Sequence, residues 1–273
     1  MTAEHCLVLR LAGPLQSWGS ASQYNRRETD SAPTKSGVIG LLAAAAGRRR
    51  TDPITDLLDL SLGVRVDQEG SLLRDYHTVS DFRGRPLLAA KVDAKGRQKP
   101  TSPAKYTGVT QRFYLQDAAF VAVVGGDANL LAGLADAVRN PTFPLALGRR
   151  SCVPGRPPLV PSPDGESLWS GSVHEVIHRV DWQASEARRD RLRRRKALGS
   201  TVTLAATVDS GCVPVGSADR EDLRTDVPQS FDQLHRGFSV RSVQHLWVEL
   251  STGEPEPENA VTHDPFELLE WGP

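Results

Sequence analysis

The sequence of 273 residues lacks long apolar runs, paired cysteines and a net charge. Its longest apolar run, Val38 to Ala46, is too short to cross a membrane. The first residues do not show the basic and then apolar pattern of a secretory signal peptide. Cys6, Cys152 and Cys212 are far apart, which excludes a disulfide framework and a metal-binding spacing. We therefore expect a cytoplasmic protein with no membrane partner.

Charge is balanced over the whole chain but uneven along it. Lys and Arg number 33, as do Asp and Glu, which gives a formal net charge of zero. Residues 83–112 and 188–196 are strongly basic, whereas acidic residues gather in 219–226 and 254–270. This distribution predicts a basic groove with an acidic flank, which the total charge conceals.

Hydrophobic periodicity predicts a mixed α+β chain. Apolar residues at helical spacing predict helices over 33–47, where Gly47 suits the C-terminal end, and over 130–138, before Pro141. Residues 82–111 contain few apolar side chains, so we expect them to project as an arm or hairpin. Alternating or β-branched runs predict strands over residues 5–11, 62–66, 75–79, 113–124, 145–148, 173–180, 202–208 and 242–250.

The order of these elements predicts two domains, which the chain is long enough to form. A β-α-β unit, a long insertion and a second β-α-β unit over residues 1–152 are typical of a ferredoxin-like sandwich, the fold of RNA-recognition modules. The Pro- and Gly-rich stretch 153–165 follows this unit. The short strands of residues 153–273 predict a smaller β-rich domain that ends in an acidic tail.

Two glycine-containing segments carry the strongest functional signal. Residues 13–19 form a glycine turn after the first strand, and residues 34–37 form a polar helix entrance. Free backbone N–H groups, hydroxyls, Lys35 and two nearby arginines suit a phosphate backbone. These features favour a nucleic-acid partner. In such a partner Trp18 is as well suited to stacking or wedging as it is to filling the core.

Residues 174–178 match the zinc-hydrolase pattern H-E-x-x-H. The surrounding valines and isoleucine favour a strand, on which His174 and His178 would lie about 13 Å apart and too far to share one ion. No third ligand is evident downstream. A zinc protease is therefore disfavoured.

Other patterns have more ordinary explanations. Thr29 and Thr34 stand where a phosphate-binding loop requires Gly, so nucleotide hydrolysis is not expected. Leu15–Gly19 resembles a nucleophile elbow without its first Gly, and no catalytic partner can be assigned. Asp75–His77 fits either an acid/base pair for RNA cleavage or a buried strand. Arg188–Lys196 fits a solvated helix face, a disordered loop or a phosphate contact.

Ordered blocks of residues resemble the CasD family of subunits of Cascade, the type I-E CRISPR surveillance complex. The main blocks are Leu9–Gly19, Pro33–Leu42, Arg74–Val79, Arg112–Phe120 and Leu147–Cys152. Looser matches follow at Asp226–Phe231 and Arg241–Val243. The basic run 188–196 and the acidic tail have no counterpart in this resemblance.

The resemblance implies a non-catalytic subunit that binds the repeat-derived 5′ handle of the CRISPR RNA and caps the guide ribonucleoprotein in antiviral defence. It implies a groove in the ferredoxin-like domain and a thumb over residues 82–111 that kinks the guide. The implied partners are the CRISPR RNA, the large subunit, the terminal backbone subunit and, through the complex, target DNA. No cofactor or metal is implied. Relatives of another subtype cleave RNA without metal through Tyr, Lys and His, so a metal-independent CRISPR repeat endoribonuclease is the alternative.

The segments and the resemblance together predict one set of RNA-binding residues. The set is Gly13, Gln16, Ser17, Trp18, Gly19, Arg26, Arg27, Thr34, Lys35, Ser36, Gly37, Lys105, Tyr106, Arg112, Arg149 and Arg150.

Overall fold

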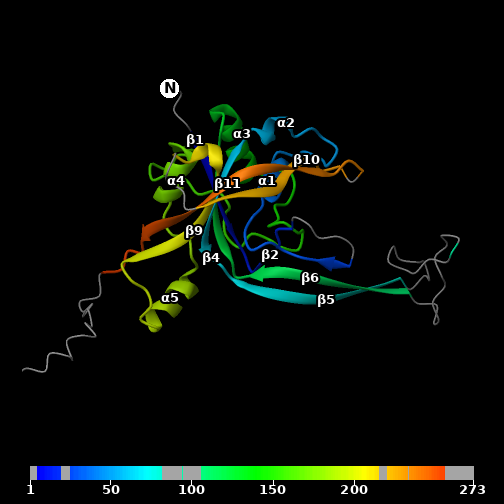
Figure 1. Ribbon diagram of the computed structural model, residues 1–273, viewed down its shortest axis with the longest axis horizontal. Helices are drawn as coiled ribbons and strands as arrows, with labels where there is room; N and C mark the ends of the chain where they lie inside the picture. The colour runs from blue at the N-terminus through cyan, green and yellow to red at the C-terminus, as the bar shows by residue number, and fades with distance from the viewer. Residues whose placement is uncertain are drawn as a thin grey trace, which may run out of the picture.

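A seven-stranded antiparallel sheet forms the centre of the computed structural model (Figure 1). The structure describes residues 5–19, 25–81, 94, 106–214, 220–232 and 234–255. In spatial order the strands of this sheet are β10 (Arg220–Ser230), β11 (Gly237–Ser251), β9 (Thr201–Asp209), β4 (Ser61–Gln68), β7 (Ala119–Gly126), β1 (His5–Ala12) and β8 (Trp169–Ser170). With few helices beside it, the sheet gives a mixed α+β architecture, as the sequence predicts.

The central strands are buried on both faces. Along β1, Leu7, Leu9 and Leu11 point into a first core, and Cys6 and Val8 point into a second. Alternate residues of a strand face opposite sides, so a strand with helices on both sides is apolar throughout. The burial of β1 and β7 on both sides explains why these two segments are the clearest strand signals in the sequence.

Helices α1 (Lys35–Ala45) and α3 (Ala128–Arg139) enclose the first core, and α2 (Thr55–Leu58) lies beside them (Figure 1). Both long helices confirm the predicted spans, and Gly47 at φ +77° follows the end of α1 in the conformation that favours glycine. The second core lies under α4 (Val173–Arg179), with α5 (Glu186–Arg194) at its margin. None of these helices, in the part of the chain that the structure describes, is long and apolar enough to cross a membrane.

A second sheet of four strands carries the long hairpin of Figure 1. Strand β6 (Tyr106–Gln116) pairs along its whole length with β5 (Ser71–Asp81) and, on its other edge, with β2 (Leu15–Gln16) and β3 (Arg26–Arg27). The predicted strand 113–124 is divided between β6 and β7 at Asp117, which has φ +55°. Of the predicted arm 82–111, residues 106–111 belong to β6, and the rest lies outside the described residues apart from Ala94.

Two predicted strands are wrong. Residues 145–148 form an irregular segment that bends at its end, where the Leu147 carbonyl accepts from the Ser17 N–H at 3.1 Å. The edge of β1 where such a strand would pair is taken by β8 and by the segment 155–160, which bonds to the backbone of Val8, Arg10 and Ala12. Residues 173–179 form α4 and not a strand, and Val180 is the C-cap of that helix.

The sheet takes strands from both sides of residue 152, the predicted domain boundary. Strand β9 pairs with β4 through Gly63–Arg65, and β11 and β10 continue the sheet outward. The sequence pattern does not predict β10, whereas β9 and β11 confirm the strands expected over 202–208 and 242–250. The division at residue 152 remains a prediction.

Candidate nucleic-acid interface

The glycine turn after β1 points its aromatic ring inward. Trp18 is 1% exposed, and its indole N–H donates to Gln16 Oε1 at 3.0 Å. Gln16 is also buried, and its amide donates to the carbonyls of Leu11 at 3.0 Å and Ala118 at 2.7 Å. The expected stacking of Trp18 on a base is therefore not supported, because the ring fills the first core.

The helix entrance is also satisfied from inside the protein. The Thr34 hydroxyl caps α1 by accepting from the Gly37 N–H at 3.2 Å. The Lys35 N–H, where the sequence predicts a phosphate, donates to the carboxylate of Asp226 at 2.8 Å. The Lys35 ammonium pairs with Asp209 at 3.0 Å. A carboxylate of β10 thus occupies the anion position at the N-terminus of α1.

Arg241 holds both carboxylates in place. It donates to the two oxygens of Asp226 at 2.7 and 3.0 Å and also to Asp209. Burial opposes ionisation of Asp226, but the hydrogen bonds and charge of Arg241 outweigh it and hold the pKa of that carboxyl below its ordinary value. Lys35, Asp209, Asp226 and Arg241 therefore form an internal ion network, and Lys35 has no free charge for RNA.

The four-stranded sheet brings other predicted residues together. In the strand register Arg27 of β3 lies beside Arg112 of β6, which lies beside Asp75 of β5. Side chains in register share a face of the sheet, and His77, two residues from Asp75, lies on it as well. We call the surface formed by Arg27, Asp75, His77 and Arg112 the basic face.

Two atoms on the basic face are buried without a hydrogen-bond partner: Arg112 Nε and His77 Nδ1. A buried polar atom without a partner is costly, so such atoms commonly mark the place of a water or ligand. Arg27 is exposed. The sequence shows Arg27, Asp75, His77 and Arg112 only as separate polar residues, and the strand register shows that they adjoin.

The opposite side of the same sheet is aromatic. Tyr76 is 65% exposed, and the guanidinium of Arg26 lies 5.1 Å from the ring centroid of Phe113. Tyr76 and Arg26 both lie in register with Gln111, two residues from Phe113. We call Arg26, Tyr76 and Phe113 the aromatic face. Aromatic and arginine side chains on a sheet suit the stacking of unpaired bases.

Arg149 is a clamp between backbone segments. Its guanidinium donates to the carbonyls of Phe113 at 3.0 Å and of Arg27 at 2.8 Å, and lies 4.8 Å from the centroid of the Tyr114 ring. Arg149 therefore positions β3 against β6 at the margin of both faces. Its neighbour Arg150 is exposed.

The remaining predicted residues are two serines, two glycines and the pair Lys105 and Tyr106. Ser17 and Ser36 are buried, and Ser17 Oγ donates to the Phe113 carbonyl at 3.2 Å. Gly13 allows close approach, since a Cβ there would lie 2.6 Å from the Val153 carbonyl oxygen. Gly19 is exposed. Lys105 lies outside the described residues, as does the side chain of Tyr106.

The H-E-x-x-H segment is helical, so the strand predicted there is wrong. Glu175 forms a capping box with Ser172, its carboxylate accepting from the Ser172 N–H at 2.8 Å. His178 Nδ1 lies 2.7 Å from the His174 carbonyl, and burial together with the charge of His178 lowers the pKa of His174. Glu175 is thus engaged in capping its own helix. Across the ranges given above, no three His, Cys, Asp or Glu side chains are grouped to hold a metal ion.

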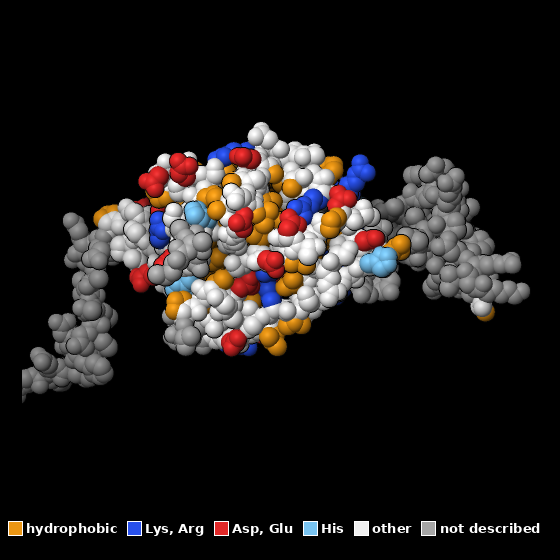
Figure 2. Space-filling view, turned by 90° about the horizontal axis from the view of Figure 1, so that it is seen from above, with side chains coloured by type: hydrophobic (Ala, Val, Ile, Leu, Met, Phe, Trp, Pro, Cys, Tyr) orange, Lys and Arg blue, Asp and Glu red, His pale blue; other side chains and the backbone are white. Residues whose placement is uncertain are grey.

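Figure 2 shows the molecule from above the view of Figure 1. Acidic, basic and apolar side chains are interspersed over this face, and no extended area of one charge is seen among the residues it colours. Of the predicted RNA-binding residues, Arg26, Arg27 and Arg112 lie on the two faces of the four-stranded sheet.

Two solved structures share this fold over most of its length. A chain of a structure described as a CRISPR RNA-guided surveillance complex is 31% identical, with a TM-score of 0.66 over 90% of this chain and 91% of that chain. A structure described as a crystal structure of a Cas protein is 33% identical, with a TM-score of 0.60 over 93% of this chain and 100% of that chain. Both similarities define the class as CRISPR-associated proteins.

The family follows from the sequence. Residues 6–244 match the model of the family described as CRISPR-associated protein (Cas_Cas5), and the chain belongs to that family. A relative from Escherichia coli strain K12, the CRISPR system Cascade subunit CasD, is 36% identical over 161 residues. The alignment spans 54% of this chain and 66% of the relative, slightly less than two thirds of the relative's length.

Proposed function

We propose that this protein is a non-catalytic subunit of a type I-E CRISPR surveillance complex that binds the 5′ handle of the CRISPR RNA and caps the guide ribonucleoprotein in the cytoplasm. The observation that carries the proposal is the structural similarity to a chain of an RNA-guided surveillance complex, which extends over 90% of this chain. The sequence similarity to a Cascade subunit supports the same assignment.

The proposed RNA-binding domain is ferredoxin-like and covers residues 1–152, with a smaller β-rich unit over 153–273. The antiparallel order β4-β7-β1, with α1 and α3 both packed on one side, supports a ferredoxin-like arrangement within residues 1–152. The next strand of that sheet, β8 (Trp169–Ser170), comes from the 153–273 segment. The proposed thumb is the extension of the β5–β6 hairpin over residues 82–111. Its support is the unbroken pairing from Ser71–Gln116 to Asp81–Tyr106, which carries the two strands away from the core (Figure 1).

The handle is proposed to lie on the four-stranded sheet. Arg27 and Arg112 of the basic face, with Arg150, neutralise phosphates, which gives a salt-dependent share of the affinity. Tyr76 and Phe113 lie on the opposite, aromatic face, so the strand must pass round an edge of the sheet for its splayed bases to stack on them. The partners in this proposal are the CRISPR RNA, the large subunit, the terminal backbone subunit and, through the complex, target DNA.

The hairpin geometry favours binding over cleavage. Tyr76 and His77 are consecutive on β5, so their side chains point to opposite sides of the sheet. A general acid and a general base must reach the same phosphodiester. A metal-independent repeat endoribonuclease remains the alternative function, and it requires His77 to act with a group other than Tyr76.

Crosslinking tests the handle proposal. The tagged protein is purified with its complex from its host, irradiated, and digested so that crosslinked peptides and nucleotides are both identified. The expected crosslinks join peptides of β3, β5 and β6 to a constant 5′ segment shared by all bound guides. Crosslinks confined to the spacer or the 3′ end contradict the proposal.

Cleavage is tested on the same preparation. A repeat hairpin RNA incubated with the purified protein in a chelator is expected to remain intact. Cleavage that is lost in His77→Ala and retained in a matched surface variant, Arg49→Ala, would establish the endoribonuclease instead.

A further inference from the structure

Helix α5 carries the basic run that the CRISPR resemblance leaves unexplained. The Ser185 hydroxyl caps it by accepting from the Arg188 N–H at 3.2 Å, and Ser185 donates through its N–H and hydroxyl to Gln68 at 3.1 and 2.9 Å. The Arg189 guanidinium lies 4.9 Å from the ring centroid of the buried Trp182 and donates to its carbonyl. Leu192 packs against the second core. One side of α5 is thus fixed to the protein.

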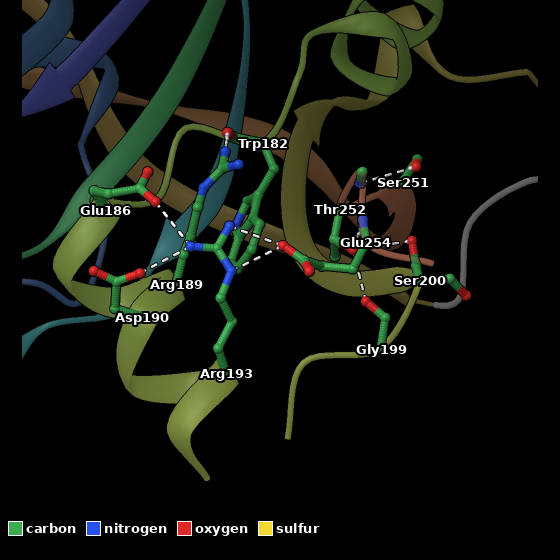
Figure 3. A network of polar contacts seen from close by, with 11 residues as sticks. Trp182, Glu186, Arg189, Asp190, Arg193, Gly199, Ser200, Ser251, Thr252 and Glu254 are labelled. Carbon is green, nitrogen blue, oxygen red and sulfur yellow. Dashed lines mark hydrogen bonds and ion pairs between the residues drawn. The ribbon is translucent and has the colours of Figure 1, made fainter. Parts of the chain in front are cut away.

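Three carboxylates near α5 are engaged by one arginine (Figure 3). Arg193 donates to Glu186 at 2.9 Å, to Asp190 at 2.8 Å and to Glu254 at 2.8 and 2.9 Å. These hydrogen bonds raise the pKa of Arg193 above its ordinary value. Because one guanidinium engages all three of these carboxylates, no acidic side chain among the described residues pairs with the other cations of the helix.

The other cations project outward together. Arg188, Arg191 and Arg195 lie three and four residues apart, so they share one side of the helix over about 10 Å. No hydrogen bond or ion pair joins their side chains, or those of Arg194 and Lys196, to another residue within the described ranges. All five of these residues are exposed, and we call them the outer basic surface of α5: Arg188, Arg191, Arg194, Arg195 and Lys196.

We propose that this outer basic surface of α5 binds the phosphate backbone of a nucleic-acid duplex, without reading its sequence. Closely spaced, unneutralised guanidinium groups complement a line of phosphates. Arg189 covers the nearby Trp182, which is 4% exposed, so the described part of the chain offers no ring beside this surface on which an unpaired base can stack. Single strands depend on such rings, whereas a duplex presents phosphates outward.

This surface is separate from the proposed handle site. In Figure 1, α5 lies below β9 and β4, on the side away from the free end of the β5–β6 hairpin. A contact there would place a duplex against the subunit while the four-stranded sheet holds the guide. The inference stands without the handle proposal, because it uses none of the residues of the basic or aromatic face.

Fluorescence anisotropy with the full chain tests the inference. The probes are a labelled DNA duplex of about 30 base pairs and arbitrary sequence, the corresponding RNA duplex, and a single strand of the same length, each over a salt series. The variant is Arg188→Gln with Arg191→Gln and Arg195→Gln. The matched control, Arg49→Gln with Arg50→Gln and Arg139→Gln, removes the same charge from positions outside α5.

The α5 variant is expected to bind the duplex at least about tenfold more weakly. The plot of log K against log salt should also become less steep, by about 0.9 for each phosphate that the variant no longer neutralises. The control and the single strand are expected to change less than twofold. If the variant loses affinity equally for the DNA and RNA duplexes, the surface binds the backbone of both. If it loses affinity for only one of them, that duplex is the one that the surface binds. Unchanged duplex affinity and slope, or an equal loss with the single strand, would overturn the inference.

Discussion

The indole ring of Trp18 lies against the backbone of Gly37, at the start of α1. A Cβ placed on Gly37 would lie 2.7 Å from Cε3 of that ring, closer than a Cβ approaches a non-bonded carbon. The glycine turn after β1 and the helix entrance, which stand apart in the sequence as two separate signals, are therefore two halves of one packing contact. The contact fixes α1 on β1 and so positions the first core.

Gly37→Ala is expected to destabilise the protein by about 1–3 kcal/mol, because the added methyl group overpacks the Trp18 contact. Denaturant unfolding measures the change. Gly133→Ala is the control: nothing lies within 4 Å of a Cβ at that position in α3. It is expected to stabilise by about 0.5–1 kcal/mol through the lower entropy of the unfolded chain. Equal stabilities of the two variants would show that Trp18 does not constrain position 37.

Trp18→Phe distinguishes a core residue from a base-stacking residue. The substitution removes the indole N–H from Gln16 Oε1 and is expected to cost about 1–3 kcal/mol of folding free energy through that unpaired buried acceptor. Handle binding by the folded variant should stay within about twofold of the wild type, since the ring is 1% exposed. A large loss of RNA affinity with unchanged stability would restore the stacking role.

Local patterns predict the elements that depend on local forces. β1, α1 and α3 are predictable because apolar spacing and caps lie within each segment. The sequence predicts a strand where α4 forms, although Val173, Val176, Ile177 and Val180 have helical spacing and Ser172 begins a capping box. The β-branched side chains favour a strand, but the capping box and the burial of the apolar side of the segment stabilise the helix.

The site was predictable in composition but not in arrangement. The residues around Lys35 suit a phosphate, and nothing near it in the sequence shows that its charge is already paired. Its partners are remote: Asp226 lies 191 residues further along the chain and Asp209 lies 174 residues further. Arg27, Arg112 and His77 adjoin only through the pairing of β3, β6 and β5. Neither relationship leaves a periodic signal in the sequence, so only the tertiary structure separates the internal cations from the exposed ones.

Arg65→Met is expected to destabilise the protein by about 3–5 kcal/mol, because it leaves a buried carboxylate without its partner. The side chains of Arg65 and Asp67 are fully buried and paired at 2.7 Å. Arg65 also donates to the carbonyls of Ile177 at 2.6 Å and Val180 at 2.8 Å, at the C-terminal end of α4. Denaturant unfolding measures the loss, and amide exchange of α4 should rise in the same variant.

The double variant Arg65→Met with Asp67→Leu is the control for that pair. It removes the stranded charge and should recover part of the loss, since a buried ion pair is often replaceable by apolar residues. Recovery should be incomplete, because the Asp67 carboxylate also accepts from the Gln183 N–H at 2.6 Å. A double variant less stable than Arg65→Met would show that the carboxylate is not the source of the cost.

Asp226 makes stability depend on pH in the acid range. Arg241 holds the folded-state pKa of this carboxyl below its ordinary value of 3.8, against the opposing effect of burial. The stabilisation is therefore complete above about pH 5 and is lost as the pH falls through the folded-state pKa.

Asp226→Asn should cost about 1.5–3 kcal/mol at pH 7, the worth of a hydrogen bond to a charged group, and progressively less in acid. Urea unfolding from pH 7 to pH 3 measures the difference, with the exposed Asp136→Asn as a variant that should follow the wild type throughout. If Asp226→Asn and the wild type lost stability in parallel over that range, the carboxylate at the N-terminus of α1 would not be held ionised by Arg241.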